Sequence, residues 1–180
     1  MWRSTTSMMM LATAGLGAWS TVAQAGSITG QISVALRVSS GCQVTNGASG
    51  NDSIGNLGTL DFGTVSPTWN SPLAANLSGQ GTSGQLQVTC APGITAFTVT
   101  VDGGLRGNRT LGYAQNTVAY EVFQNPARSV TYPIGTPKTF NVPQDGSAVT
   151  VPIYGAVTPN PSTAKVAGTY ADTLLMTLNF

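Results

Sequence analysis

The sequence predicts an all-β protein, and three observations support this fold class. Hydrophobic residues make up 41% of the 180 residues but charged residues only 7%, whereas an average soluble domain has roughly 25% charged residues. Gly (22 residues) and Pro (10 residues) punctuate the whole chain. Apolar and polar residues alternate with period two in one segment after another, as side chains do along a strand with one buried face.

The alternating segments begin at residue 28 and continue to the end of the chain. Their inward residues are Ile28, Ile32, Val34, Leu36 and Val38; Leu86, Val88 and Cys90; Phe97, Val99 and Val101; Val118, Tyr120 and Val122; Phe140 and Val142; Val149, Val151 and Ile153; and Leu174, Met176, Leu178 and Phe180. Turn formers such as Asn46-Gly47, Asp102-Gly103-Gly104 and Asp145-Gly146 separate them. Short strands divided in this way are typical of an immunoglobulin-like β-sandwich. We expect one domain over residues 41–180, preceded by one additional strand and its hinge over residues 26–40.

The first residues have the three parts of a secretory signal peptide. A basic start at Arg3 precedes a short apolar centre and an Ala23-Gln24-Ala25 site, which predicts a signal peptide over residues 1–25 that is cleaved after Ala25. The alternative is a membrane anchor, but the apolar centre falls short of the roughly 20 residues that a spanning helix needs. Loss of Arg3 leaves equal numbers of basic and acidic residues.

Composition excludes several functional classes. The chain has no His and a formal net charge of +1, so the usual serine and cysteine protease sites, His-ligated metals and a basic nucleic-acid surface are absent from the sequence. In an exported chain, Cys42 and Cys90 indicate one disulfide, which would contribute about 4 kcal/mol in the chain-entropy model. Two unpaired buried thiols are the alternative.

The N-terminal alternation from Ile28 to Val38 is the longest in the chain and predicts an amphipathic strand that needs a sheet edge. The alternation from Leu174 to Phe180 predicts a last strand whose far edge needs another strand beside it. The N-terminal strand can pair within its own domain, or it can complete the sheet of a neighbouring subunit and build a head-to-tail fibre. The connector Ser39-Ser40-Gly41 reaches only about 10 Å, which is comparable with the spacing between two packed sheets. This short reach favours pairing with a neighbouring subunit but does not decide between the two arrangements.

Several short motifs occur in a specific order along the chain. They are Thr29-Gly30-Gln31, Ser40-Gly41-Cys42, Gly58-Thr59-Leu60-Asp61-Phe62-Gly63, Val88-Thr89-Cys90, Asp102-Gly103-Gly104, Arg109-Thr110-Leu111, Val118-Ala119-Tyr120, Val151-Pro152-Ile153-Tyr154-Gly155, and Gly168-Thr169-Tyr170-Ala171-Asp172-Thr173-Leu174 leading to Asn179-Phe180. Through them the chain resembles the major pilins of archaic, Csu-type chaperone-usher pili, within the spore coat protein U domain family of secreted bacterial proteins.

The resemblance implies an incomplete immunoglobulin-like sandwich that lacks its last strand. A periplasmic chaperone would fill the resulting groove, and an outer-membrane usher would replace it with the donor strand of the next subunit. Ile28, Ile32, Val34, Leu36 and Val38 would be the donor residues. Leu174, Met176, Leu178 and Phe180 would form a wall of the acceptor groove and contact the chaperone, with the Phe180 carboxylate on a basic anchor. The Cys42–Cys90 bridge would tie the first strand to the second.

Together these features predict a non-enzymatic pilus (fimbrium) subunit at the cell surface, in adhesion and biofilm formation, with no cofactor and no nucleic-acid partner. The absence of an added adhesive domain favours a shaft subunit. A self-complemented secreted module that binds carbohydrate or a surface is the alternative, and Trp69 is the residue such a module would use, although an aromatic beside Pro67 is more often a packing lid. A hydrolase would need a pair among the scattered acids Asp52, Asp61, Asp102, Glu121, Asp145 and Asp172.

Overall fold

The computed structural model describes residues 31–38, 40–44, 56–79 and 84–180. The chain divides into two compact units, Met1–Leu36 and Arg37–Phe180. The predicted signal peptide, the predicted donor residue Ile28 and the predicted turn at Asn46-Gly47 lie outside the described residues. Within the described ranges, no helix is long and apolar enough to cross a membrane.

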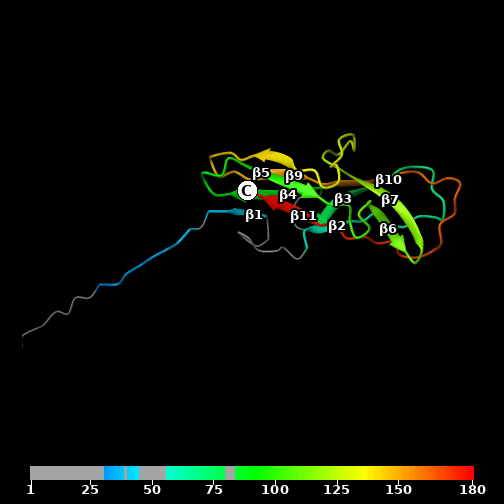
Figure 1. Ribbon diagram of the computed structural model, residues 1–180, viewed down its shortest axis with the longest axis horizontal. Helices are drawn as coiled ribbons and strands as arrows, with labels where there is room; N and C mark the ends of the chain where they lie inside the picture. Colours follow the sequence, from blue (N-terminus) through cyan, green and yellow to red (C-terminus); the bar gives the residue numbers. More distant parts are fainter. Residues whose placement is uncertain (1–30, 39, 45–55, 80–83) are drawn as a thin grey trace, which may run out of the picture. The chain divides into compact units, whose positions relative to one another are not determined.

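The described part of Arg37–Phe180 is built from antiparallel strands and contains no helix, which confirms the all-β fold class (Figure 1). The strands are β1 (Cys42–Val44), β2 (Gly58–Leu60), β3 (Leu73–Gly79), β4 (Gln85–Cys90), β5 (Ala96–Val101), β6 (Thr110–Tyr113), β7 (Asn116–Phe123), β8 (Lys138–Asn141), β9 (Val149–Pro152), β10 (Tyr154–Val157) and β11 (Met176–Asn179).

Two of the sheets join at Ile153 into a single layer. β9 pairs with β4, and β10 pairs with β3 and β7. Between these ladders the N–H of Leu77 donates to the carbonyl of Ile153, and the N–H of Ile153 donates to the carbonyl of Gly84. Residues 149–157 therefore run as one nearly continuous strand through the order β1-β4-β9 and β2-β3-β10-β7-β6. The order β11-β5-β8 forms the facing layer.

One apolar core lies between the layers, and the alternation seen in the sequence builds it. Phe97, Val99 and Val101 point inward from β5, and each is at most 3% exposed. They belong to the same cluster as Val122 of β7 and Val151 of β9, which are fully buried. Alternation therefore identified strands that carry much of the buried apolar core, whereas the two largest buried side chains, Arg109 and Tyr132, lie outside the strands.

The structure also differs from the sequence-based expectation at particular strands. The alternation from residue 174 becomes a strand only at Met176. β2 and β6 span only Gly58–Leu60 and Thr110–Tyr113, which is too short for a period-two pattern to identify them. Residues 31–38 form no strand, because a strand is defined by a pairing partner, and none pairs with this segment in the described chain.

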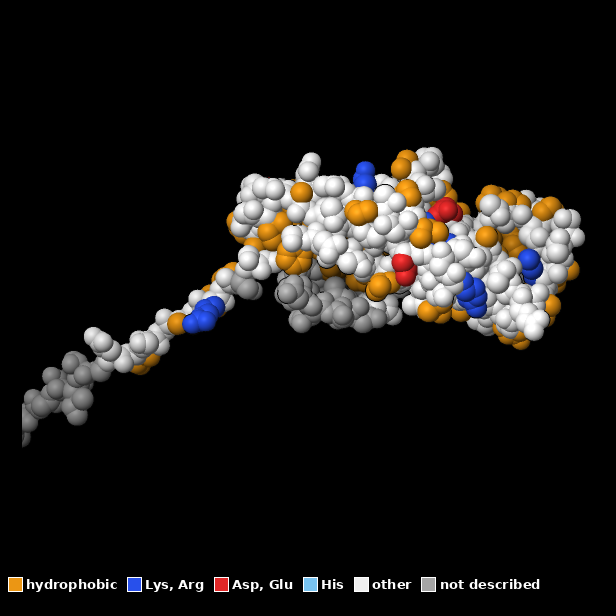
Figure 2. All heavy atoms as spheres, in the orientation of Figure 1, with side chains coloured by type: hydrophobic (Ala, Val, Ile, Leu, Met, Phe, Trp, Pro, Cys, Tyr) orange, Lys and Arg blue, Asp and Glu red, His pale blue; other side chains and the backbone are white. Residues whose placement is uncertain are grey.

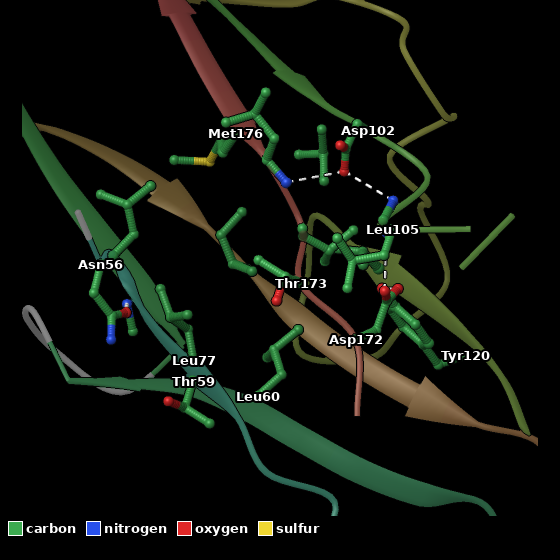
Figure 3. A pocket seen from close by; sticks show the side chains of 18 of the residues that line it. Asn56, Thr59, Leu60, Leu77, Asp102, Leu105, Tyr120, Asp172, Thr173 and Met176 are labelled. Atoms are coloured by element: carbon green, nitrogen blue, oxygen red, sulfur yellow. Dashed lines mark hydrogen bonds between the residues drawn. The ribbon is translucent and has the colours of Figure 1, made fainter. Parts of the chain in front are cut away.

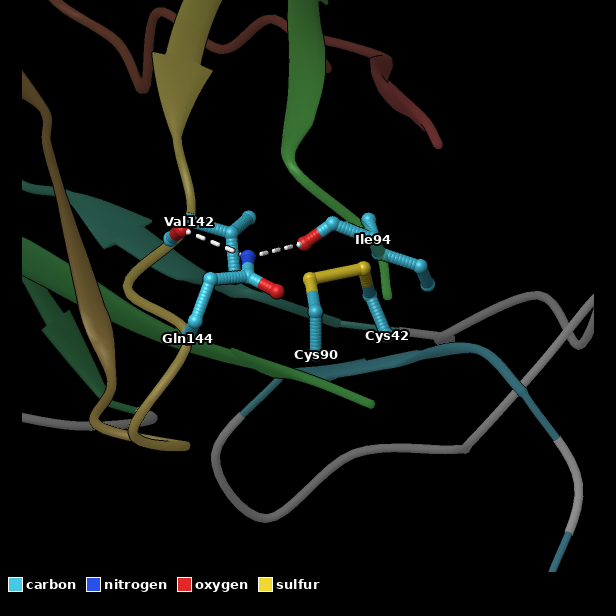
Figure 4. The surroundings of a disulfide bond; sticks show 5 residues. All are labelled: Cys42, Cys90, Ile94, Val142 and Gln144. Carbon is cyan, nitrogen blue, oxygen red and sulfur yellow. Dashed lines mark hydrogen bonds between the residues drawn. A yellow bond between two sulfur atoms is a disulfide. The ribbon is translucent and has the colours of Figure 1, made fainter. Parts of the chain in front are cut away.

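The predicted disulfide between Cys42 and Cys90 is present (Figure 4). The two cysteines are direct register partners in the β1–β4 ladder, with Cα atoms 3.9 Å apart. The bridge thus ties the first strand to the fourth, which corrects the expectation that it would tie the first to the second. Beside it, the Gln144 amide donates to the carbonyls of Ile94 and Val142 (Figure 4).

Replacing both cysteines in the variant Cys42→Ala/Cys90→Ala should lower the free energy of unfolding by about 4 kcal/mol, because the bridge closes a loop across 48 positions and restricts the unfolded chain. Urea unfolding followed by circular dichroism measures this. Dithiothreitol should shift the unmodified chain to the midpoint of the variant and leave the variant unchanged. Equal midpoints for the two oxidised proteins would contradict a stabilising role.

Candidate functional site

Two strand edges face a hollow in the domain. Among the described strands, β2 pairs with β3 alone and β11 pairs with β5 alone. Each therefore has a second edge whose backbone N–H and C=O groups lack a strand partner, which makes it a template for another strand. A hollow of about 630 Å³ lies between them, with Leu60 of β2 on one side and Met176 of β11 on the other (Figure 3).

A second hollow of about 600 Å³ continues the first. Both hollows are lined by Thr59, Leu60, Phe62, Leu111 and Asp172, so these residues mark the place where they meet. One wall of the combined space is residues 56–67, and the other is residues 165–176. We call this space the groove.

Two side chains that line the groove, Leu60 and Phe62, pack against a glycine. A Cβ atom at Gly155 of β10 would lie 2.9 Å from the ring of Phe62 and 3.3 Å from Leu60. Gly155 therefore leaves room for both side chains to pack down on the layer. The ring of Phe62 also lies 6.2 Å from that of Tyr120, measured between centroids. Any larger residue at position 155 would therefore displace the Phe62 ring.

The residues predicted for the acceptor wall do not all line the groove. Leu174 and Met176 line the first hollow. Leu178 is on the same face of β11 and packs, half-buried, against the core. Phe180 is 48% exposed. The wall thus consists of the segment that precedes β11 as much as of β11 itself.

The described residues of the predicted donor segment are fully accessible. Within 31–38, the side chains of Ile32, Val34, Leu36 and Val38 are 83–92% exposed. Figure 2 shows hydrophobic side chains along this segment. Burying one such side chain against another surface would contribute about 1.5–3 kcal/mol.

Arg109 is the buried charge at the base of the loop of residues 102–109. Its side chain is 2% exposed and forms an ion pair with Glu121. It also donates hydrogen bonds to the main-chain carbonyls of Tyr132, Val101 and Asp102. Its backbone is in the left-handed region, with φ of 53°, which costs about 1–2 kcal/mol. The hydrogen bonds hold it there and join the loop to β5 and β7.

The acidic residues near the groove have structural partners. Glu121 pairs with Arg109, and Asp172 accepts a hydrogen bond from the Tyr120 hydroxyl at 2.7 Å. Burial is the main cause of the raised pKa of Tyr120, and the hydrogen bond to Asp172 is the second cause. The hydroxyl therefore remains a donor. Burial likewise raises the pKa of Tyr132. No group of three or more His, Cys, Asp or Glu suited to a metal occurs in the described ranges.

Trp69 packs, half-buried, against the core, and its indole N–H donates to the carbonyl of Thr158 at 2.8 Å. Its backbone forms a bridge with Asn160. These contacts confirm the expectation of a packing lid, although the residue also lines the second hollow.

The opposite wall, with Leu60, Phe62 and Leu111, was not identified as a site from the sequence. A weak signal was present, because Leu60 and Phe62 alternate with Thr59 and Asp61. The alternation is too short to distinguish a groove wall from an ordinary strand.

The fold and the groove define an all-β domain with an apolar site left open between two sheet edges. The sequence model of the Spore Coat Protein U domain matches residues 28–177, so the chain belongs to the Spore Coat Protein U domain family. The match begins at Ile28, the first residue of the predicted donor segment, and extends through the groove into β11.

Among solved structures, the chain is similar to the crystal structure of the CsuC-CsuE chaperone-tip adhesion subunit pre-assembly complex from archaic chaperone-usher Csu pili of Acinetobacter baumannii. The sequences are 16% identical, with a TM-score of 0.48. The match covers 79% of this chain and 40% of that chain. No curated protein matches in sequence.

Replacing the buried guanidinium in Arg109→Met should lower the free energy of unfolding by about 3 kcal/mol, since Glu121 and three carbonyls lose their donor. Arg106→Met is the matched control, because Arg106 is an exposed cation of the same loop and its loss should change stability by less than about 0.5 kcal/mol. Urea unfolding of the two variants measures the difference. Equal effects would show that Arg109 acts through net charge alone.

Proposed function

We propose that this chain is a structural pilus subunit that polymerises by donor strand exchange into a thin adhesive fibre for surface attachment and biofilm formation. The observation that carries the proposal is the groove, which is bounded by edges of β2 and β11 that pair with no other described strand and is lined by many apolar side chains together with polar ones such as Asp102 and Asp172. Membership of the Spore Coat Protein U domain family supports it.

The proposed occupant of the groove is the segment Ile28–Val38 of a second copy. Its apolar residues alternate with polar ones, so one face would enter the groove while the other meets water. Extended, the segment is about 36 Å long at 3.3 Å per residue. The wall segments 56–67 and 165–176 contain twelve residues each, one more than the donor segment, so the donor would use both hollows.

The donor backbone would pair with the free edge of β11 and supply the missing ladder. The same subunit would offer its own N-terminal segment to the next copy. Because donor and acceptor surfaces differ, the contact repeats head to tail and yields an open fibre.

Before assembly, an empty groove exposes a sheet edge and apolar side chains together, which invites aggregation. We therefore propose that a periplasmic chaperone occupies the groove first, along Leu174, Met176, Leu178 and Phe180, and anchors the Phe180 carboxylate. An outer-membrane usher then exchanges the chaperone for the next subunit. The chain would thus pass through the periplasm to the cell surface, as a shaft subunit without enzymatic activity, cofactor or nucleic-acid partner.

Two charges on the inward face of the donor, in Ile32→Asp/Leu36→Asp, should abolish polymerisation, because each would bury an unpaired carboxylate in an apolar groove. We expect unboiled samples of the unmodified chain without residues 1–25 to give a ladder of boiling-sensitive multimers on SDS gels, and the variant to give a monomer. Size-exclusion chromatography provides the same comparison in solution.

The matched control is Ser33→Asp/Ala35→Asp, which adds the same charge to the outward face and should polymerise. The donor variant should still accept one synthetic peptide of residues 26–40 per chain, and should reject that peptide with the same two substitutions. A sharp monomer from the unmodified chain that folds alone would overturn the proposal.

Deleting residues 26–39 distinguishes the pilus subunit from a self-complemented binding module. A subunit without them should lose donor activity but still form a one-to-one complex with its chaperone. A self-complemented module would lose its own fold, which chromatography and circular dichroism would detect.

A further inference from the structure

The wall of the groove crosses from one layer of the sandwich to the other. Ala171 forms a two-hydrogen-bond bridge with Gly112 of β6, in the first layer. Met176 is in register with Val101 of β5, in the second layer. Between them, residues 172–175 form no strand but line the first hollow. Regular ladder hydrogen bonds therefore do not hold this part of the wall.

Asp102 replaces the ladder where β5 ends. Its N–H donates to the carbonyl of Leu175 at 3.1 Å. The N–H of Leu175 donates to Oδ1 of the Asp102 carboxylate at 2.9 Å, which takes the place of a main-chain carbonyl. The same oxygen accepts the N–H of Gly104 at 2.9 Å. One carboxylate thus ties the wall to the turn after β5 (Figure 3).

Asp172 makes the second attachment. Its Oδ1 atom accepts the N–H of Leu105 at 2.9 Å, and its Oδ2 atom accepts the Tyr120 hydroxyl at 2.7 Å (Figure 3). Leu105 follows β5 in one layer, whereas Tyr120 is on β7 in the other. Asp172 therefore connects both layers at the point where the two hollows meet.

The glycines of Asp102-Gly103-Gly104 make this arrangement possible. A Cβ atom at Gly104 would collide with the Asp172 carboxylate, and Gly104 has a φ of +74°. A Cβ atom at Gly103 would collide with the backbone of Gly107. The motif is thus more than a turn, because it brings two carboxylates and the groove wall together.

We infer that Asp102 and Asp172 form a clasp that sets the position of the groove wall at residues 172–176, and that uptake of the donor strand depends on it. The second part rests on the proposed function, whereas the first does not. Both are positioning residues, since they act through the wall and do not need to touch the donor.

The test uses the chain with Ile32→Asp/Leu36→Asp as parent, so that it does not polymerise through its own donor segment. Because the two carboxylates act as one unit, Asp172→Ala should speed amide hydrogen exchange at Leu175 about tenfold or more, although the acceptor of Leu175 is Asp102. Asp102→Ala should do the same at Leu105, whose acceptor is Asp172. Amides of β4 and β9 should change less.

In both variants the affinity for the synthetic 26–40 peptide should fall about tenfold or more. Asp172→Asn keeps an acceptor for the N–H of Leu105 and a second hydrogen-bonding group for the Tyr120 hydroxyl. Its amide exchange rates and its peptide affinity should therefore match those of the parent. Asp145→Ala is the matched control, because Asp145 caps Ser147 in an exposed turn and does not line either hollow.

Loss of protection only at the amide whose own acceptor was removed would overturn the clasp, as would equal acceleration throughout the domain. Normal peptide binding by Asp172→Ala would overturn the dependence of donor uptake on it. If the parent itself binds no peptide, the proposed function fails, and the exchange at Leu175 and Leu105 still decides whether the clasp exists.

Discussion

The unpaired edges of β2 and β11 are the constraint on which the other features of this domain depend. Backbone N–H and C=O groups must find partners when apolar side chains around them are buried. Here no described strand of the chain supplies partners along these edges, yet Leu60, Met176 and their neighbours form an apolar groove between them. The domain therefore has a complete apolar core beside two open sheet edges. An extended segment of alternating apolar residues would satisfy both the backbone of these edges and the side chains of the groove.

An open sandwich must remain rigid without the strand that would close it. A disulfide and the contacts of two arginines connect its strands. The disulfide ties β1 to β4, and Arg109 joins the loop after β5 to Glu121 of β7. Arg128 makes a third brace, since its guanidinium donates to the carbonyls of Gly155 and Ala75. Only 7% of the residues in the chain are charged, and Arg109 and Arg128 use their guanidinium groups for contacts within the domain. Few charged side chains therefore appear on the face shown in Figure 2.

Period two predicted the fold class and most core strands because β5 and β7 bury one face over several residues. It also predicted inward positions for Leu174, Met176 and Leu178, which pack against the core. It could not predict the opposite wall, because β2 spans only Gly58–Leu60. The alternation also could not predict that β1 pairs with β4, because it indicates which face of a strand is buried and not which strand is adjacent. The attachments of Asp102 and Asp172 join residues about seventy positions apart, and no local pattern carries that information.

The position of the two complementary surfaces in the chain explains why such a subunit would form fibres. The groove is built by Arg37–Phe180, and the alternating segment precedes Cys42. A symmetric dimer would need the same patch on both partners, whereas in the proposed contact a segment would meet a groove, which would make the contact heterologous. Each association would fill one groove and leave one segment and one groove free at the fibre ends. Growth of such a fibre would then depend on the delivery of subunits whose grooves are kept from aggregating, so the open edge that would permit polymerisation would also make a chaperone necessary.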